Sequence, residues 1–203
     1  MTLIAGMNVS RETIERLEKF AELTRKWNPS INLVAKSTLP DLWERHIVDS
    51  AQLYPLAPKS PRHWVDIGSG GGFPGIVVAA ISAEKSPETK FTLIESDQRK
   101  STFLRTAARE LGLTVNVIAS RIEEADPQNA DVISARALSA LTDLFPLISK
   151  HLTADGVAIL PKGKTYQDEI DLAKAVWRFD VQSHQSMTDE QARILVVKGI
   201  SRD

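Results

Sequence analysis

Residues 64–78 read WVDIGSGGGFPGIVV, and the fold is inferred outward from them. An apolar run ends in an acidic residue, five glycines follow within eight positions, and a second apolar run then begins. This order predicts a strand, a glycine-rich turn and a helix, which together form the first unit of a nucleotide-binding α/β sheet. Glycine accepts a positive φ and lets a ligand approach the backbone without a Cβ in the way.

The position of the acidic residue indicates which nucleotide the turn binds. A GxGxxG pattern begins at Gly70 and matches the dinucleotide fingerprint, but the strand should end near residue 67, which makes Gly68 the first turn glycine. The better motif is DxGxGxG, from Asp66 to Gly72. A carboxylate there would repel a pyrophosphate by about 4 kcal/mol at 4 Å under an effective dielectric of 20. It would favour S-adenosylmethionine (AdoMet), which carries an ammonium and a sulfonium.

Composition limits the remaining possibilities. The 203 residues suit one α/β domain with an appended piece, and 42% hydrophobic with 25% charged residues is ordinary for a globular protein. No apolar run is long enough for a membrane span, so we expect no membrane contact. The absence of cysteine excludes thiolate metal sites and cysteine nucleophiles and is typical of a cytoplasmic protein; we expect no metal. With a net charge of −1, any nucleic-acid contact must come from a local basic patch.

Residues 8–57 have a helical pattern. Ser10 is a suitable N-cap for the first helix. Pro29 should end that helix, because proline disfavours helical geometry at the preceding residue, Asn28. A second helix is expected from about residues 38–41 to residue 53.

The second helix carries the sequence WERHIVDS at residues 43–50. Arg45 and Asp49 are four residues apart, as are His46 and Ser50, so each pair should share a helix face. Spacing alone favours a surface ion pair and a hydrogen-bonded histidine over a functional site.

From residue 63 onward, strand and helix patterns alternate. Strands are expected at residues 63–67, 90–95, 114–118, 130–135, 157–160, 180–184 and 194–198. Helices are expected at residues 75–83, 98–111, 138–150 and 166–177. The pattern predicts an α/β fold: a seven-stranded, mostly parallel, Rossmann-like sheet with helices on both faces and its last two strands antiparallel. We divide the chain into an N-terminal helical extension (1–60) and an AdoMet-binding core (61–203) within one compact unit.

Ligands in such sheets bind at the carboxyl ends of the strands. Glu95 ends the second core strand and is placed to accept both ribose hydroxyls, although an exposed carboxylate would also fit. Ile122 and Glu123 follow the third strand and could flank the adenine; a solvated acidic turn is equally compatible. Arg136 follows the fourth strand, and Lys162 follows the fifth.

The loop after the fourth strand limits the chemistry. Enzymes that methylate exocyclic amines often carry Asn/Asp-Pro-Pro-aromatic there, whereas this chain has Arg136. Because the chain has no cysteine, no thiolate can attack C6 of a pyrimidine, which excludes the usual route to 5-methylcytosine. Guanine N7 has a free lone pair and no proton to lose, so its methylation needs alignment and exclusion of water rather than a general base. Arg136 could hold the guanine, a phosphate or the AdoMet carboxylate, or contact only solvent.

Five short motifs appear in order and together resemble one known family. They are WN with INL at residues 27–33, RHxxDS at 45–50, DIGSGGGFPG at 66–75, SxRA at 134–137 and KG at 162–163. Over roughly residues 20–200 the chain resembles the small-subunit ribosomal RNA guanine-N7 methyltransferases. The glycine loop alone would indicate only a class I AdoMet-dependent methyltransferase.

The resemblance implies AdoMet-dependent transfer to N7 of a guanosine in the 530 loop of 16S rRNA, near the decoding centre. By motif position it implies AdoMet contacts at Gly68, Phe73, Ile122, Glu123 and Arg136. The residue pattern adds Asp66, Gly70, Gly72 and Glu95.

The expected partner is 16S rRNA or the small ribosomal subunit, and we expect a monomer. Because the net charge is near zero, we predict a modest basic rim and a target base presented in a structured loop. The expected RNA-contacting residues are Lys36, Arg45, His46, Lys162 and Lys164, with Arg136 also at the rim.

Three alternatives remain open on the sequence. A class I methyltransferase could act on a small molecule or a protein, although the basic rim and the added helices argue against this. A non-catalytic AdoMet-binding or ribosome-assembly protein is also compatible, because N7 methylation needs no diagnostic base. An NAD-dependent oxidoreductase is disfavoured by Asp66.

Overall fold

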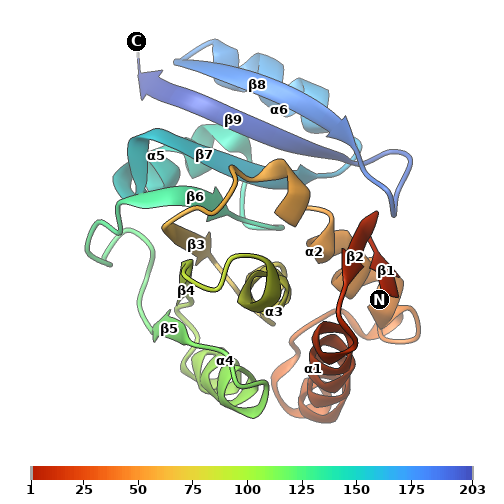
Figure 1. Cartoon of the computed structure of the whole chain (residues 1–203). Helices are drawn as coiled ribbons and strands as arrows, with labels where there is room; N and C mark the ends of the chain where they lie inside the picture. Colours follow the sequence, from red (N-terminus) through yellow and green to blue (C-terminus); the bar gives the residue numbers. More distant parts are fainter. Residues whose placement is uncertain (1, 203) are drawn as a thin grey trace.

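The computed structural model describes residues 2–202, and a seven-stranded sheet forms its centre. The strand order is β5-β4-β3-β6-β7-β9-β8 (Figure 1). The strands are β3 (His63–Ile67), β4 (Lys90–Ile94), β5 (Val115–Ile118), β6 (Ala130–Ser134), β7 (Leu152–Lys162), β8 (Trp177–Gln185) and β9 (Arg193–Arg202). The five strands from β5 to β7 in this order are parallel to one another. Strand β9 is antiparallel to both of its neighbours, β7 and β8. The predicted mostly parallel sheet is confirmed.

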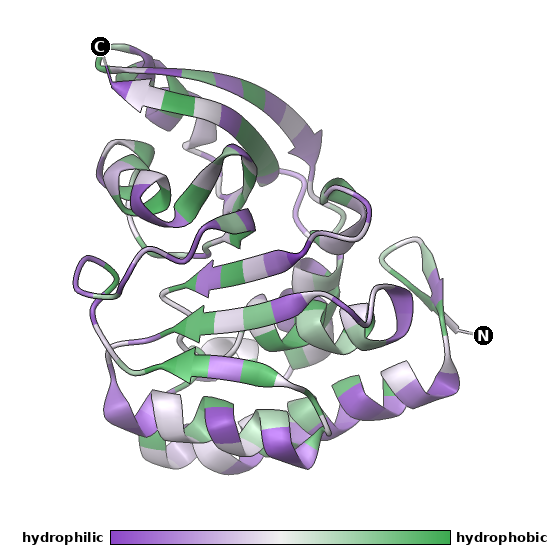
Figure 2. Cartoon of the chain, turned by 60° about the vertical axis from the view of Figure 1, so that its left-hand side comes forward, coloured by the Kyte–Doolittle hydropathy of each residue, from purple (hydrophilic) through white to green (hydrophobic). Residues whose placement is uncertain are grey.

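Helices cover both faces of the sheet, as predicted. They are α1 (Arg11–Ile31), α2 (Asp49–Ala51), α3 (Gly75–Lys85), α4 (Gln98–Glu110), α5 (Leu141–His151) and α6 (Tyr166–Lys174). Residues of α1 to α4 pack on one face, where Trp64 and Phe91 are buried, and α5 and α6 pack on the face of Val65 and Ile67. Figure 2 shows hydrophobic residues concentrated in the middle strands, while the outer helices alternate between hydrophilic and hydrophobic. Within residues 2–202, no helix is both long and apolar enough to cross a membrane.

Several element ends differ from the expected ones. Helix α5 begins at Leu141 instead of residue 138, because the preceding residues form a loop at the carboxyl edge of the sheet. Helix α6 ends at Lys174, and Trp177 already belongs to β8, where its ring packs edge-on against Phe145 at 5.8 Å. Side-chain packing in the core therefore sets these boundaries.

The described part of the chain begins with a hairpin that the sequence pattern did not predict. It consists of β1 (Thr2–Ile4) and β2 (Met7–Val9), each only three residues long, with Ile4 and Val9 buried. Ser10 then caps α1 as expected, because its Oγ accepts from the backbone N–H of Thr13 at 3.2 Å.

The expected end of the first helix is wrong. Helix α1 continues through Pro29 to Ile31, and Asn32 in the left-handed conformation ends it by donating its N–H to the Asn28 carbonyl at 2.9 Å. Proline is tolerated here because it lies in the last turn, where it removes a single helical hydrogen bond. Asn28 is buried, and its Oδ1 accepts from the N–H of Val34 at 2.8 Å, which holds it in place.

The expected second helix is present but shorter than predicted, and it contains a π turn. Helical residues run without a break from residue 42 to residue 51. The segment divides into a 3₁₀ turn η1 (Lys36–Thr38), a π-helical segment η2 (Trp43–Val48), the short α2 and a second 3₁₀ turn η3 (Tyr54–Leu56). A π turn is wider than an α turn, so residues four apart do not stack as assumed. Asp49 forms its ion pair with Arg136 at 3.1 Å, and not with Arg45.

Candidate active site

The glycine loop after β3 uses its glycines for two different reasons. Three have positive φ: Gly68 (+66°), Gly70 (+53°) and Gly72 (+87°). The other two sit where a neighbour comes too close for a side chain. A Cβ on Gly71 would lie 2.8 Å from the carbonyl oxygen of Leu33, and one on Gly75 would lie 2.7 Å from Asp66 Oδ2. The loop is therefore packed against both the N-terminal extension and the end of β3.

Asp66 lies buried beneath this loop, with 1% of its surface exposed. Trp64 Nε1 donates to Ser134 Oγ at 2.9 Å, and Ser134 Oγ in turn donates to Asp66 Oδ1 at 2.6 Å. Within the described residues, Oδ2 has no hydrogen-bond partner. Burial raises the pKa of Asp66 to about 6, despite the opposing hydrogen bonds. Oδ2 faces Gly75, the first residue of α3, whose backbone N–H opposes the rise in pKa. Asp66 therefore acts on a ligand above the loop through its charge and not by direct contact.

Glu95 joins the end of β4 to the glycine loop. Its Oε2 accepts from the N–H of Gly70 at 2.7 Å, and its Oε1 accepts from the N–H of Asp97 at 2.8 Å. Each carboxylate oxygen can accept a second hydrogen bond, so the group can still receive two hydroxyls. The donor set therefore suits a ribose at this edge of the sheet.

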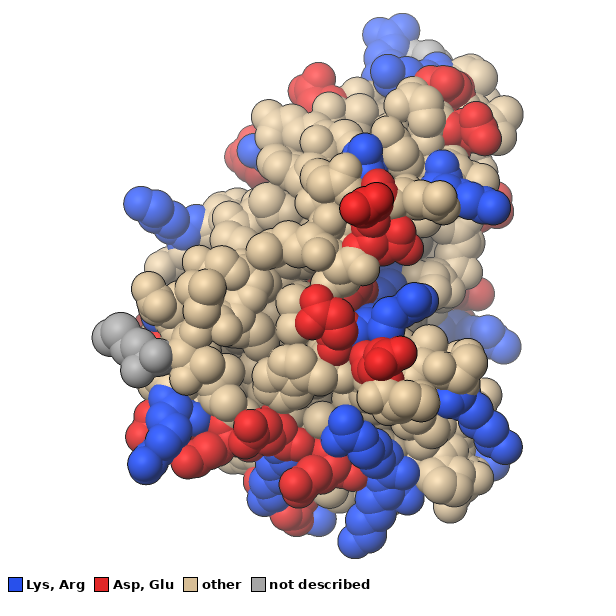
Figure 3. All heavy atoms as spheres, turned by 90° about the vertical axis from the view of Figure 1, so that its right-hand side faces the viewer, with Lys and Arg blue, Asp and Glu red and all other residues tan. Residues whose placement is uncertain are grey.

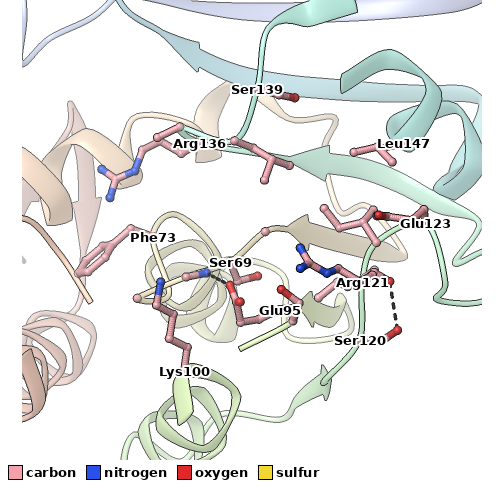
Figure 4. Close-up of a pocket in the computed structure, with 18 of the residues that line it drawn as sticks. Ser69, Phe73, Glu95, Lys100, Ser120, Arg121, Glu123, Arg136, Ser139 and Leu147 are labelled. Atoms are coloured by element: carbon pink, nitrogen blue, oxygen red, sulfur yellow. Dashed lines mark hydrogen bonds between the residues drawn. The ribbon is translucent and has the colours of Figure 1, made fainter. Parts of the chain in front are cut away.

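A first cavity of about 550 Å³ opens above the glycine loop, within the usual size range for small-molecule sites. Seven of the nine residues expected to bind AdoMet line it: Gly68, Gly70, Phe73, Glu95, Ile122, Glu123 and Arg136. Figure 4 shows Glu95 beside the loop, with Arg136 and Phe73 on the far side of the cavity. Asp66 and Gly72 do not line it; Asp66 lies beneath, and a Cβ on Gly72 would contact Phe20 and Ile76.

The loop expected to flank the adenine is held from behind by the end of α5. His151 is fully buried, and its Nε2 lies 2.9 Å from the Ile122 carbonyl, to which it donates. Lys150 Nζ donates to the Glu123 carbonyl at 2.5 Å. Both backbone carbonyls are therefore occupied, and the Ile122 side chain and the Glu123 carboxylate remain free to line the first cavity.

Arg136 lies between elements that are far apart in the sequence. Its Nη1 donates to Asp49 Oδ2 at 3.1 Å, and its Nη2 lies 2.8 Å from His46 Nδ1. Its Cζ lies 5.3 Å from the centre of the Phe73 ring, a cation–π distance. Burial lowers the pKa of Arg136, but a guanidinium remains charged at any physiological pH.

The hydrogen bonds around His46 determine its tautomer. Thr38 Oγ1 donates to the Ala35 carbonyl at 2.8 Å, so its oxygen must accept from His46 Nε2, also at 2.8 Å. His46 Nδ1 then has a lone pair to accept from Arg136. Burial, followed by the charges of Arg136 and Arg45, lowers the pKa of His46 to about 4. His46 is therefore a neutral imidazole at neutral pH, with both nitrogens engaged.

A second cavity of about 570 Å³ lies on the other side of residues 136–139, which line both cavities. Arg45, His46 and Lys162, all expected to contact RNA, line the second cavity. Lys36 and Lys164 are exposed and line neither cavity. On the face drawn in Figure 3, acidic and basic side chains are interspersed and neither sign forms a continuous surface.

Several lining residues were not predicted from the sequence. Leu33, Lys100 and Asp143 line the first cavity, and Glu169 and Thr188 line the second. Among these residues, only Leu33 has a signal in the sequence, which is the glycine at position 71. Gly71 has no positive φ, and glycine is needed there because a Cβ would come too close to the Leu33 backbone. The others reach the site through tertiary packing and have no local motif.

The sheet order, the glycine loop at the carboxyl end of β3 and the carboxylate at the end of β4 define a class I AdoMet-dependent methyltransferase. Solved structures of similar fold agree. A ribosomal protein L11 methylase from Lactobacillus delbrueckii subsp. bulgaricus has a TM-score of 0.60 at 19% identity, covering 78% of this chain and 79% of that one. A methyltransferase from Geobacter sulfurreducens has a TM-score of 0.59 at 15% identity, covering 95% and 90%.

Sequence comparison identifies the family. The family described as "GidB: rRNA small subunit methyltransferase G" matches residues 13–196, and the chain belongs to it. A ribosomal RNA small subunit methyltransferase G from Cereibacter sphaeroides is 53% identical over 97% of this chain and 94% of its own length. The protein of that name from Ruegeria pomeroyi is 52% identical over 97% and 96%.

Proposed function

We propose that the protein transfers a methyl group from AdoMet to N7 of a specific guanosine in the 530 loop of 16S rRNA in the small ribosomal subunit. The family membership supports the substrate class. The observation that carries the proposal is the pair of adjoining cavities that share residues 136–139 as a wall, one suited to the cofactor and one to a base.

AdoMet would supply a methyl group already activated on its sulfonium. In the first cavity, Glu95 would hold the ribose, Ile122 and Glu123 the adenine, and Gly68, Gly70 and Phe73 the methionine portion. Asp66 would act from beneath the loop through its charge alone, because it does not line the first cavity. Gly72 would act by shaping the loop.

The residues around the second cavity would align the base without removing a proton. Guanine N7 attacks with its own lone pair, so the site must orient it and exclude water. His46 is unsuited to act as a base, since its pKa is about 4 and both ring nitrogens are engaged. Arg136, at the boundary between the cavities, would position the reacting groups.

The RNA would contact the rim of the second cavity. Arg45, Lys36 and Lys164 are exposed and could reach phosphates around a base that has left its stack. The net charge of −1 and the interspersed charges on the face drawn in Figure 3 favour a structured ribosomal particle over extended naked RNA. We propose a monomer acting in the cytoplasm.

The direct test uses labelled AdoMet and small subunits from cells that lack the protein. After digestion of the RNA, mass spectrometry identifies the labelled nucleoside. We expect 7-methylguanosine at a single site. If AdoMet binds but no label enters the RNA, the cofactor assignment stands and the RNA substrate is wrong, which favours a small-molecule substrate or a non-catalytic role.

A further inference from the structure

The second cavity contains an ion pair whose position is not explained by binding of the cofactor. Lys162, the last residue of β7, has its Nζ 2.8 Å from Glu169 Oε2 in the first turn of α6. Only 10% and 19% of their side-chain surfaces are exposed. Both line the second cavity, and Lys162 also donates to the carbonyl of Ser139, in the shared wall, at 2.7 Å.

Three carboxylates line the second cavity: Asp49, Glu169 and Asp189. They differ in exposure and in hydrogen-bond partners. Asp49 Oδ2 accepts from Arg136, and its Oδ1 accepts from Gln52 Nε2 at 3.0 Å and Thr188 Oγ1 at 2.8 Å. Within the described residues, Lys162 is the only polar partner of Glu169. Asp189 is exposed, and its Oδ1 accepts from the N–H of Gln191 at 2.9 Å. Glu169 Oε2 is enclosed beside Lys162, whereas Oε1 has no partner among the described residues. Glu169 is therefore the shielded carboxylate of the second cavity that keeps an oxygen free, with two acceptor positions for a ligand.

The reaction itself does not select guanine. Adenine also has an N7 lone pair, so the enzyme must distinguish the purines by another part of the base. The Watson–Crick edge does so: guanine presents one acceptor, O6, followed by two donors, N1–H and the N2 amino group. An ammonium beside a carboxylate presents the complementary donor and two acceptors. Adenine would place its amino group against the lysine and the N1 lone pair against the carboxylate.

We propose that Lys162 and Glu169 read the Watson–Crick edge of the target guanine, with Lys162 donating to O6 and Glu169 accepting from N1–H and the N2 amino group. The orientation is consistent with the reaction. O6 is the neighbour of N7 on guanine, and Lys162 touches the wall at Ser139, so a base with O6 at Lys162 turns N7 toward the first cavity. This inference rests on the proposed function and adds the residues that determine its base specificity.

The test compares guanosine with inosine, which lacks the N2 amino group, at the target position. 16S rRNA ligated to carry either nucleoside is assembled into small subunits, and kcat/KM for methylation is measured. The wild-type protein should prefer guanosine by about 10-fold or more, the usual loss when a buried charged acceptor is left without its donor. Glu169→Gln should lower activity on guanosine by about 10- to 100-fold and bring the guanosine-to-inosine ratio close to one.

Three further variants make the result specific. Glu169→Asp keeps a carboxylate and should retain a preference for guanosine despite lower activity. Lys162→Met should lower activity on both substrates by the same factor, because both carry O6. Asp168→Asn, at the exposed neighbour of Glu169 in the same helical turn, should change neither rate. The AdoMet Kd should be the same for all the proteins, which reports an intact first cavity.

Two outcomes would overturn the inference. If Glu169→Gln lost activity on guanosine and inosine equally, the ion pair would be structural. If the wild type did not distinguish the two nucleosides, the N2 amino group would not be read. Both results leave the proposed function intact, whereas absence of 7-methylguanosine with the wild type would overturn the function as well.

Discussion

Among single residues, Arg136 makes the most varied contacts at the site. One guanidinium pairs with Asp49, hydrogen-bonds to His46 and lies over the Phe73 ring, and it lines both cavities. A planar group with several fixed donors can make these contacts together, whereas an ammonium acts as a single compact charge. The rate of methyl transfer should therefore depend on the shape of this side chain as well as on its charge.

Replacing Arg136 by lysine tests this point. Arg136→Lys should lower kcat by about 10- to 100-fold, because hydrogen bonds to charged groups contribute about 1.5–3 kcal/mol each and at least one is lost. The AdoMet Kd should change much less, as measured by calorimetry. Arg62→Lys is the matched control, since Arg62 pairs with Asp131 on the surface with 84% of its side chain exposed, and it should leave kcat unchanged. An unchanged kcat in Arg136→Lys would mean that Arg136 does not position the reacting groups.

Asp66 should make AdoMet affinity depend on pH. Its pKa is raised to about 6, and a cation bound nearby lowers it again, so binding below pH 6 must release a proton. AdoMet affinity should therefore rise from pH 5 to pH 7, and the rise should disappear in Asp66→Asn. Calorimetry at three pH values measures this. A product analogue without the sulfonium charge should show a weaker dependence; equal slopes for both ligands would contradict the assignment.

The same pKa shift affects stability in the opposite direction. Between the usual value of 3.8 and about 6, the folded protein holds the Asp66 proton more tightly than the unfolded chain does. The contribution of this group to the free energy of unfolding therefore falls as pH rises through that window. Denaturant unfolding of the ligand-free protein at pH 4 and pH 7, compared with Asp66→Asn, should show this loss in the wild type only. Equal differences in the two proteins would exclude it.

At the scale of elements, the glycine loop depends on the connector after α1. Gly71 packs directly against the backbone of Leu33, with 2.8 Å between its Cβ position and the carbonyl oxygen. A backbone neighbour cannot move aside as a flexible side chain does. The N-terminal extension therefore supports the loop that forms the floor of the first cavity.

Gly71→Ala should destabilise the protein by about 1–3 kcal/mol through overpacking and should weaken AdoMet binding. Gly163→Ala is the control, because no atom lies within 4 Å of its Cβ position and its φ is not positive. Urea denaturation should show a change of less than about 0.5 kcal/mol for the control. If both variants were equally stable, the close approach of Leu33 would not be important.

The extension is also where the element predictions failed. The pattern of residues 38–53 was helical, and residues 42–51 are helical, but six of them form a π turn instead of an α-helix. Local periodicity could not predict this, because the widened turn allows His46 to bond to both Thr38 and Arg136 while Asp49 also reaches Arg136. These partners are separated from the segment by up to 90 residues and are brought to it by the sheet.

At the scale of the molecule, the described residues of the extension (2–60) and of the AdoMet-binding core (61–202) share a hydrophobic cluster. Phe20 of α1 is fully buried, 5.0 Å from the Phe73 ring and 6.2 Å from the Phe103 ring. Trp27 packs on Phe103 at 5.6 Å. We propose that the two parts unfold together as one cooperative unit.

Phe20→Ala should lower the free energy of unfolding by about 3–5 kcal/mol and keep a single transition. Leu172→Ala, at a leucine that is 66% exposed, should have little effect. Circular dichroism reports the whole chain, and tryptophan fluorescence of a variant that keeps only Trp27 and Trp43 reports the extension. Different midpoints by the two methods would contradict a single unit.

The sequence alone determined the properties that depend on neighbours along the chain. The alternation of strands and helices, the turn after residue 67 and the acidic residues that end two strands follow from local patterns, because parallel strands bring their carboxyl ends to one edge. Only the tertiary structure decided how the second cavity is built. Lys162 is seven residues from Glu169, Arg136 is 87 residues from Asp49, and their functions depend on distances that packing of the sheet, its helices and the extension creates.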